Sequence, residues 1–154
     1  MKNYLFLIAL VMSVLTFTSC DKNKGKGLDP ETLAGNVEKP TWVADTVNYD
    51  YSSSMTAVIK VDLLASYPVM AKDFQLNDND LLSAFSGETC VGVAKCVNGL
   101  FYLFVAGKEG PVTLRFYSGY YKNLFEAKDA FTFQNDAILG TYTEPFKPTF
   151  LVVK

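Results

Sequence analysis

Short segments with alternating apolar and polar residues follow one another along the chain from residue 42 onward. The stretch 55–62, MTAVIKVD, and the stretch 112–117, VTLRFY, both place apolar residues at every second position. Because successive side chains of a β-strand point to opposite faces, this spacing predicts two strands that each bury one face. The expected buried faces consist of Met55, Ala57, Ile59 and Val61 in the first strand and of Val112, Leu114 and Phe116 in the second.

Turn residues divide the rest of this region into further segments. Asn98-Gly99 separates 89–97 from 100–106 and is the two-residue signal of a β-hairpin with a type I′ turn. Lys108-Glu109-Gly110 predicts another hairpin, which leads into the strand at 112–117. Other apolar segments predict strands at 81–85, 130–133 and 149–153. A set of about seven to eight short strands without a long helix indicates an all-β fold, most simply an antiparallel, immunoglobulin-like β-sandwich.

The first 19 residues have the composition of a secretory signal peptide. Lys2 precedes an apolar run at 4–17, and small residues follow at Thr18 and Ser19. As a helix this run would span about 21 Å, short of the roughly 30 Å hydrocarbon core of a bilayer. A cleaved signal peptide is therefore favoured over a permanent transmembrane helix.

The junction at 17–20, FTSC, resembles the lipobox of bacterial lipoproteins. The resemblance implies that Cys20 is lipidated on its sulfur and becomes the first residue of the mature chain. Phe17 stands where Leu is usual, a departure that the looser signals of Bacteroidota accept. With more than one acyl chain, at about 0.8 kcal/mol for each buried methylene, we expect a stable membrane anchor. The expected location is the outer membrane, on either its periplasmic or its surface face; the alternative is a soluble exported protein with an unmodified cysteine.

The expected domain organisation has three parts. Residues 1–19 form the signal peptide, and residues 20–40 form the lipidated cysteine and a flexible tether rich in lysine and glycine. Residues 41–154 form the β-sandwich domain, since this length suits a single ordinary domain.

Charge and composition exclude several functions. Fourteen basic and sixteen acidic residues give a formal charge of -2, and no block of like charge is present, so we expect no nucleic-acid partner. Histidine is absent, which removes the commonest general base and the His-dependent catalytic triads. We therefore expect no catalysis and no cofactor. The alternative is a carboxylate-based enzyme acting on saccharides, with a pair such as Asp80 and Glu88 as acid and base.

The two remaining cysteines, Cys90 and Cys96, lie on the same predicted strand. Six residues apart in a strand, they would share one face and be separated by about 20 Å, whereas a disulfide needs Cα atoms within about 4.4 to 6.8 Å. An oxidising compartment favours a disulfide, but the hairpin contradicts one. We expect two separate thiols that pack as small apolar groups.

Two loops carry candidate binding residues. Asp78 and Asp80 lie in an Asn- and Asp-rich stretch whose oxygens make them weak calcium candidates, but the stretch lacks the spacing and distal Glu of a calcium loop. We therefore expect no metal and a solvated turn that Asp80 caps. Tyr117, Tyr120 and Tyr121 surround a glycine and would present flat faces for stacking on sugar rings or for an interface hot spot. The alternative is that these tyrosines close the edge of the sandwich.

The stretch 80–94, DLLSAFSGETCVGVA, resembles a motif of secreted and lipid-anchored Bacteroidota proteins. Upstream, Tyr49, Tyr51 and 54–56, SMT, match the same family, as does 113–117, TLRFY, downstream. The family implies a β-sandwich of largely uncharacterised role without agreed catalytic residues. This chain departs from the family at two places. Val91 stands where the family often has Arg, and the Pro that the family often has near the position of Cys96 is missing.

Within that motif, Gly87 suits a turn with positive φ, and Gly92 predicts a bulge or the close approach of a neighbour such as Phe85. Taken together, the residues predict a membrane-anchored, non-catalytic module for binding, adhesion or assembly at the cell envelope. Its expected partner, besides the membrane, is a glycan or an envelope protein.

Overall fold

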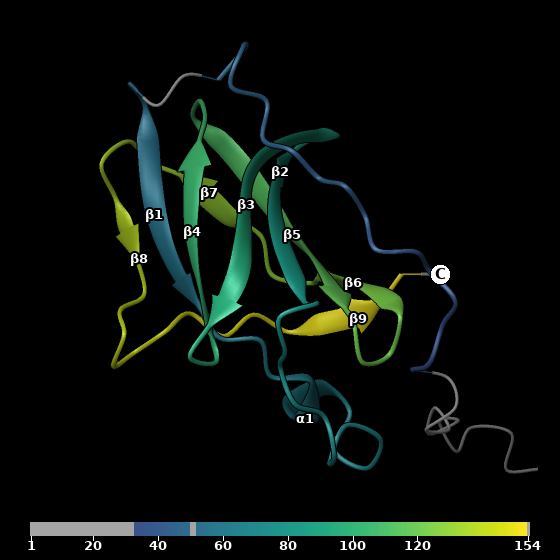
Figure 1. Ribbon diagram of the computed structural model, residues 1–154. Helices are drawn as coiled ribbons and strands as arrows, with labels where there is room; N and C mark the ends of the chain where they lie inside the picture. The colour runs from purple at the N-terminus through teal and green to yellow at the C-terminus, as the bar shows by residue number, and fades with distance from the viewer. Residues whose placement is uncertain (1–32, 50–51, 154) are drawn as a thin grey trace, which may run out of the picture.

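The computed structural model describes residues 33–49 and 52–153 (Figure 1). The signal peptide, Cys20 and the tether up to residue 32 lie outside the described residues, so these expectations stay predictions. No helix in the described part of the chain is long and apolar enough to cross a membrane.

Nine strands in the described residues are joined by hydrogen bonds into one sheet, with the order β8-β1-β4-β3-β2-β5-β6-β9 and with β7 paired to β5. The pairing is antiparallel except between β1 and β8. In chain order the elements are β1 (Ser54–Ile59), α1 (Leu63–Ser66), β2 (Leu81–Ser86), β3 (Thr89–Val97), β4 (Leu100–Ala106), β5 (Gly110–Ser118), β6 (Asn123–Ala127), β7 (Phe131–Phe133), β8 (Ile138–Leu139) and β9 (Phe150–Val152). The all-β prediction is confirmed, whereas the immunoglobulin-like sandwich stays a prediction.

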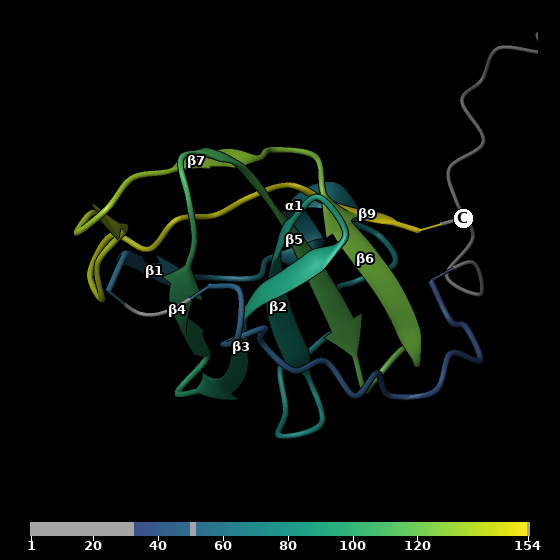
Figure 2. The same cartoon turned by 90° about the horizontal axis from the view of Figure 1, so that it is seen from above.

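The sheet curls so that strands far apart in its order face one another, as Figure 2 shows from above. Phe101 on β4 and Phe116 on β5 are separated by two intervening strands, yet their ring centroids are 5.9 Å apart. The interior of the curl is the hydrophobic core, because the apolar alternate positions of β1, β4 and β5 all point into it. Its largest fully buried side chains include Phe101, Phe116, Phe125, Phe133 and Phe150.

The predicted hairpin at Asn98-Gly99 is confirmed. β3 and β4 pair directly, and Asn98 and Gly99 have φ values of 52° and 78°, as a type I′ turn requires. The predicted hairpin at 108–110 is wrong, because β4 pairs with β1 and β3 while β5 pairs with β2, β6 and β7. Each of these two strands has an apolar face. The chain crosses from one side of the core to the other between β4 and β5, so that the two faces pack in the same core.

A β-bulge interrupts the alternation of β3. Ala84 pairs with Gly92, but the next residue, Phe85, pairs with Cys90, so Val91 is one extra residue on β3. Cys96 packs against the core, whereas Cys90 shares the opposite face with its partner Phe85. The expectation that both cysteines share one face is wrong, because the bulge reverses the alternation between them.

Both cysteines are free thiols, as predicted. Burial raises the pKa of Cys90 and of Cys96, which makes both less reactive than an exposed thiol. The predicted close approach at Gly92 is also present, but the neighbour is the carbonyl oxygen of Phe104 on β4 rather than the ring of Phe85. A side chain at position 92 would meet that oxygen.

Residues 33–45 run along the outer face of the sheet, and we call this segment the N-terminal strap (Figure 1). Leu33 is fully buried in the core. The amides of Gly35 and Val37 donate to the carbonyls of Tyr121 and Lys122, at 2.8 and 2.9 Å, and Asp45 donates to Cys90 at 2.8 Å. Residues 33–40, expected to be part of the tether, therefore pack on the domain.

Candidate functional site

The structure does not bring the three predicted tyrosines onto one platform. Tyr117 is buried, and its hydroxyl donates to the carbonyl of Val37 in the strap at 3.2 Å. Tyr121 is buried on the core side, where its hydroxyl donates to Met70 at 3.0 Å and burial raises its pKa. Tyr120 is 54% exposed and is the one accessible ring of the three. Tyr117 and Tyr121 thus serve the packing of the sheet and its loops.

Of the two weak calcium candidates, Asp80 accepts backbone hydrogen bonds instead. Asp80 is fully buried, and its carboxylate accepts hydrogen bonds from the amides of Asn77 at 2.7 Å and Gly119 at 2.8 Å. Asp78 is exposed. The described residues contain no group of three or more His, Cys, Asp or Glu side chains that would hold a metal ion. Of the two roles expected for Asp80, the turn cap is the one that the geometry supports.

Asp80 and Glu88 do not form a catalytic pair. They lie at opposite ends of β2, a strand of six residues, which separates them by about 20 Å. Glycoside hydrolysis by two carboxyl groups needs a separation of about 5 to 9.5 Å. Glu88 instead faces Arg115, at 3.4 Å between Oε2 and Nη2.

Arg115 is the centre of a cluster on the outer face of the sheet. Its Nε donates to Glu126 at 3.0 Å, and its guanidinium lies over the ring of Phe85, 4.4 Å from the centroid. Trp42 of the N-terminal strap meets the same ring edge-on at 5.8 Å. The cluster fixes the strap to the sheet, which is a structural role for Trp42.

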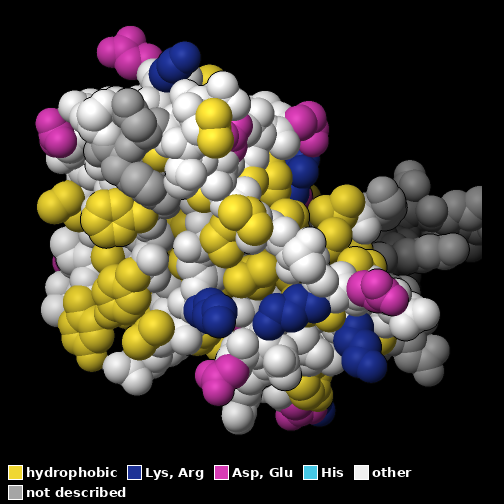
Figure 3. Space-filling view, turned by 45° about the horizontal axis from the view of Figure 1, so that its top comes forward, with side chains coloured by type: hydrophobic (Ala, Val, Ile, Leu, Met, Phe, Trp, Pro, Cys, Tyr) yellow, Lys and Arg dark blue, Asp and Glu magenta, His cyan; other side chains and the backbone are white. Residues whose placement is uncertain are grey.

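The most prominent unassigned surface lies on the outer face of β8, β1 and β4. We define the aromatic face as four exposed side chains on these strands and the segment after β8: Tyr102 at 43%, Phe104 at 58%, Ile138 at 74% and Tyr142 at 69% exposure. Figure 3 shows hydrophobic side chains gathered over this part of the molecule, on the left of the view. An apolar surface of this kind is informative because most soluble proteins keep their large apolar side chains scattered.

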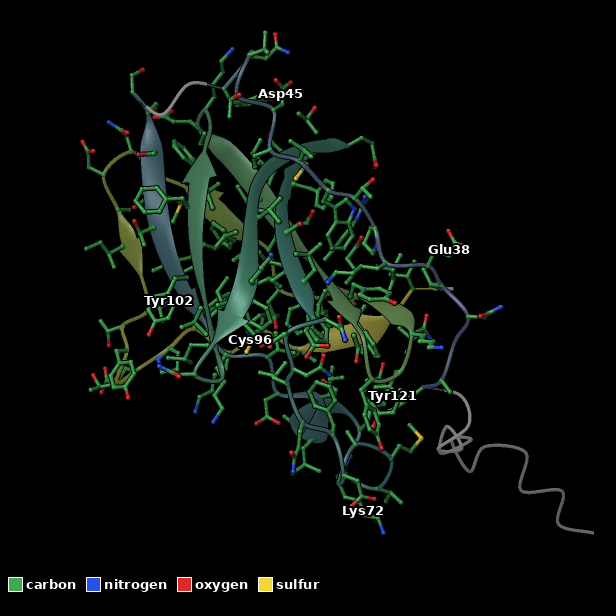
Figure 4. All side chains as sticks on the ribbon, in the orientation of Figure 1. Glu38, Asp45, Lys72, Cys96, Tyr102 and Tyr121 are labelled. Atoms are coloured by element: carbon green, nitrogen blue, oxygen red, sulfur yellow. The ribbon has the colours of Figure 1, made fainter. Side chains whose placement is uncertain are left out.

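Strand register explains why these side chains gather. Thr56 on β1 pairs with both Phe104 and Ile138, so the three residues form one row across the sheet. Tyr102 pairs with Val58 in the next row on the same face, and Figure 4 shows Tyr102 pointing away from the core. Tyr102, Phe104 and Ile138 are thus held by paired strands, whereas Tyr142 lies in the segment between β8 and β9.

A groove continues from the aromatic face beyond the end of β1. It has a volume of about 370 Å³ and is lined by Lys60, Asn98, Gly99, Leu100, Tyr142, Thr143, Pro145 and Lys147. Lys60 lies two residues after Val58 and therefore continues the same face of the chain. Leu100 on β4 lines the groove and lies two residues before Tyr102, on the same side of the strand, which joins the groove to the aromatic face.

The electrostatic character of the groove comes from lysine. Its lining contains two ammonium groups, on Lys60 and Lys147, and no carboxylate. Among the described residues, side-chain ion pairs within 4.0 Å are confined to Arg115 and its two glutamates. Neither Lys60 nor Lys147 therefore has a carboxylate of the described residues within 4.0 Å of its ammonium group.

Aromatic planes beside ammonium, amide and hydroxyl groups suit reversible binding of a ligand with both apolar faces and polar edges. The sequence interpretation missed this surface. The sequence places Tyr102 and Phe104 on one face of the predicted strand at 100–106, but it does not indicate which face is exposed.

Comparisons with protein-family models, with curated proteins and with solved structures found no match for this chain. The assignment of a function therefore depends on the geometry described above.

Proposed function

We propose that this protein is a lipid-anchored module of the bacterial cell envelope that binds a glycan on the aromatic face without catalysis. The observation that carries the proposal is the set of exposed side chains held in register across β8, β1 and β4, which continues into the groove through Leu100 of β4. Sugar rings have apolar faces and hydroxyl edges. They stack on tyrosine rings and hydrogen-bond to groups such as those of Asn98 and Thr143.

The membrane part of the proposal concerns Cys20, which carries the acyl chains and anchors the mature chain in the outer membrane. Twelve residues, 21–32, separate Cys20 from Leu33, the first described residue of the N-terminal strap. Substitution of Cys20 by Ala is expected to release the protein from the membrane fraction. Retention of the Cys20→Ala protein in washed membranes would overturn the anchor.

The finer classification, a Bacteroidota module with an immunoglobulin-like sandwich, belongs to the same proposal. It is supported by the resemblance at residues 80–94 and by the curl that sets Phe101 opposite Phe116. The absence of catalysis is supported by the absence of histidine and by the wide separation of Asp80 and Glu88.

The test is a glycan array probed with the intact mature protein in detergent. The proposal predicts retention of at least one polysaccharide, recovered without loss of chain length. The alternative, a carboxylate-based enzyme acting on saccharides, predicts new reducing ends in the bound polysaccharide. An array without any retained glycan would overturn the binding function.

A further inference from the structure

Resting on the proposed glycan-binding function, we propose that the ligand is an anionic polysaccharide whose charged groups pair with Lys60 and Lys147 while its sugar rings lie against Tyr102 and Tyr142. The proposal joins the aromatic face to the groove as one binding surface.

Backbone hydrogen bonds place the two lysines beside the same groove. The amide of Phe146 donates to the carbonyl of Val58, and the amide of Lys60 donates to the carbonyl of Phe146, both at 2.9 Å. Ile59 and Phe146 therefore form a parallel bridge between β1 and the segment that precedes β9. Lys60 and Lys147 each follow a residue of this bridge, so the fold holds their backbones side by side, and both side chains are exposed.

The charge of the groove differs in sign from that of the whole chain. The chain carries a formal charge of -2, yet the groove lining contains two lysines and no carboxylate. The nearest acidic residue along this segment is Glu144, which is exposed and is not part of the lining. A local positive potential of this kind attracts an anionic ligand and repels a cationic one.

The groove extends beyond one sugar-sized hollow. Lys60 and Gly99 also line a second hollow of about 460 Å³, which runs toward α1 and includes Lys72. Asp62 is the one carboxylate in the lining of this second hollow. Because lysines lie on both sides of the point where the hollows meet, the surface suits a chain with repeated negative charges better than a single anion.

The experiment uses the mature protein in detergent and two matched pairs of polysaccharide. The first pair is polygalacturonate and its fully methyl-esterified form, which keeps the backbone and removes the carboxylate charge. The second pair is chondroitin sulfate and its desulfated, carboxyl-reduced form. Poly-glutamate serves as an anionic polymer without sugar rings. Each pair tests whether loss of the negative charge weakens binding: the first pair removes carboxylates alone, and the second removes carboxylates and sulfates together.

We expect at least one acidic form to bind more tightly than its neutral partner, with an affinity that falls as salt is raised. Lys60→Gln and Lys147→Gln are each expected to weaken that binding by about two- to fivefold, and the double variant by about tenfold, with no effect on a neutral glycan. Lys128→Gln, at an exposed lysine that lines neither hollow, is the matched control.

Three outcomes would overturn the inference. Equal binding of acidic and neutral forms, with no effect of the lysine variants, leaves the proposed glycan binding intact but removes the anionic ligand. If poly-glutamate binds as tightly as the acidic glycan, the surface recognises negative charge alone and not sugar rings. Failure of all these glycans, together with an array that retains none, overturns both the inference and the proposed function.

Discussion

The carboxylate of Asp80 and the amide of Gly119 are joined by a hydrogen bond of 2.8 Å between two turns far apart in the chain. The other carboxylate oxygen of Asp80 accepts from Asn77 at 2.7 Å, so one buried side chain closes its own turn and fixes the turn that follows β5. Gly119 allows this contact because a Cβ atom there would lie 2.6 Å from Cβ of Asn79. The loop that resembled a calcium site is thus explained as a junction between turns.

Asp80→Ala is expected to lower the free energy of unfolding by about 2 to 4 kcal/mol, because two backbone N–H groups lose a charged acceptor. Asp78→Ala is the control: this exposed residue is expected to change stability by about 0.5 kcal/mol at most. Urea denaturation of both variants measures the difference. Equal stabilities of the two variants would contradict the role of Asp80.

The same residue predicts a pH dependence. Desolvation raises the pKa of Asp80 above its ordinary value of 3.8, so the folded state binds this proton more tightly than the unfolded chain. Folding stability from this group is therefore present below pH 3.8 and is lost as the pH rises through the folded-state pKa. We expect the stability of the wild type, relative to Asp80→Asn, to fall as the pH rises above 3.8. A difference that grows with pH would contradict this assignment.

The N-terminal strap predicts a contrast between two of its apolar residues. Leu33→Ala is expected to cost about 2 to 4 kcal/mol, because Leu33 is fully buried and its truncation leaves a cavity. Val43→Ala, at a residue that is 78% exposed, is expected to change stability by about 0.5 kcal/mol at most. Thermal unfolding of the full chain tests both. A negligible effect of Leu33→Ala on stability would contradict the packing of the strap and would mean that residues 33–40 belong to the flexible tether.

The two free thiols predict slow alkylation in the native state. Burial raises the pKa of Cys90 and Cys96, so the thiolate fraction at neutral pH is small and grows as the pH rises. Alkylation followed by mass spectrometry is expected to show slow native labelling, an increase with pH, and fast labelling of both cysteines after unfolding. An intact mass that increases by about two hydrogens on reduction alone would reveal a disulfide and contradict the bulged hairpin.

Much of the sheet was predictable because its signals are local. The Asn98-Gly99 turn depends on positive φ at two adjacent residues, and the buried face of β1 depends on alternation within one segment. The N-terminal strap carries no such signal. Gly35 and Val37 find their hydrogen-bond partners at Tyr121 and Lys122, a pairing that depends on the finished fold.

The candidate site was less predictable for the same reason. Every residue of β4 is apolar, so the alternation does not say which face is buried; the fold buries Leu103 and Val105 and exposes Tyr102 and Phe104. Of the three tyrosines at 117–121 only Tyr120 is exposed, because the N-terminal strap covers Tyr117 and the loop at Met70 covers Tyr121. Exposure in both cases depends on segments distant in the chain.

The most direct test of the account is the affinity of a retained polysaccharide for a Tyr102→Ala/Tyr142→Ala double variant, measured by titration calorimetry. Tyr120→Ala is the matched control, since Tyr120 is 54% exposed but belongs neither to the aromatic face nor to the groove. At about 1 kcal/mol or more for each stacked ring, the account predicts at least a tenfold loss of affinity in the double variant and none in the control. An unchanged affinity in a folded double variant, or an equal loss in Tyr120→Ala, would contradict the aromatic face as the binding site.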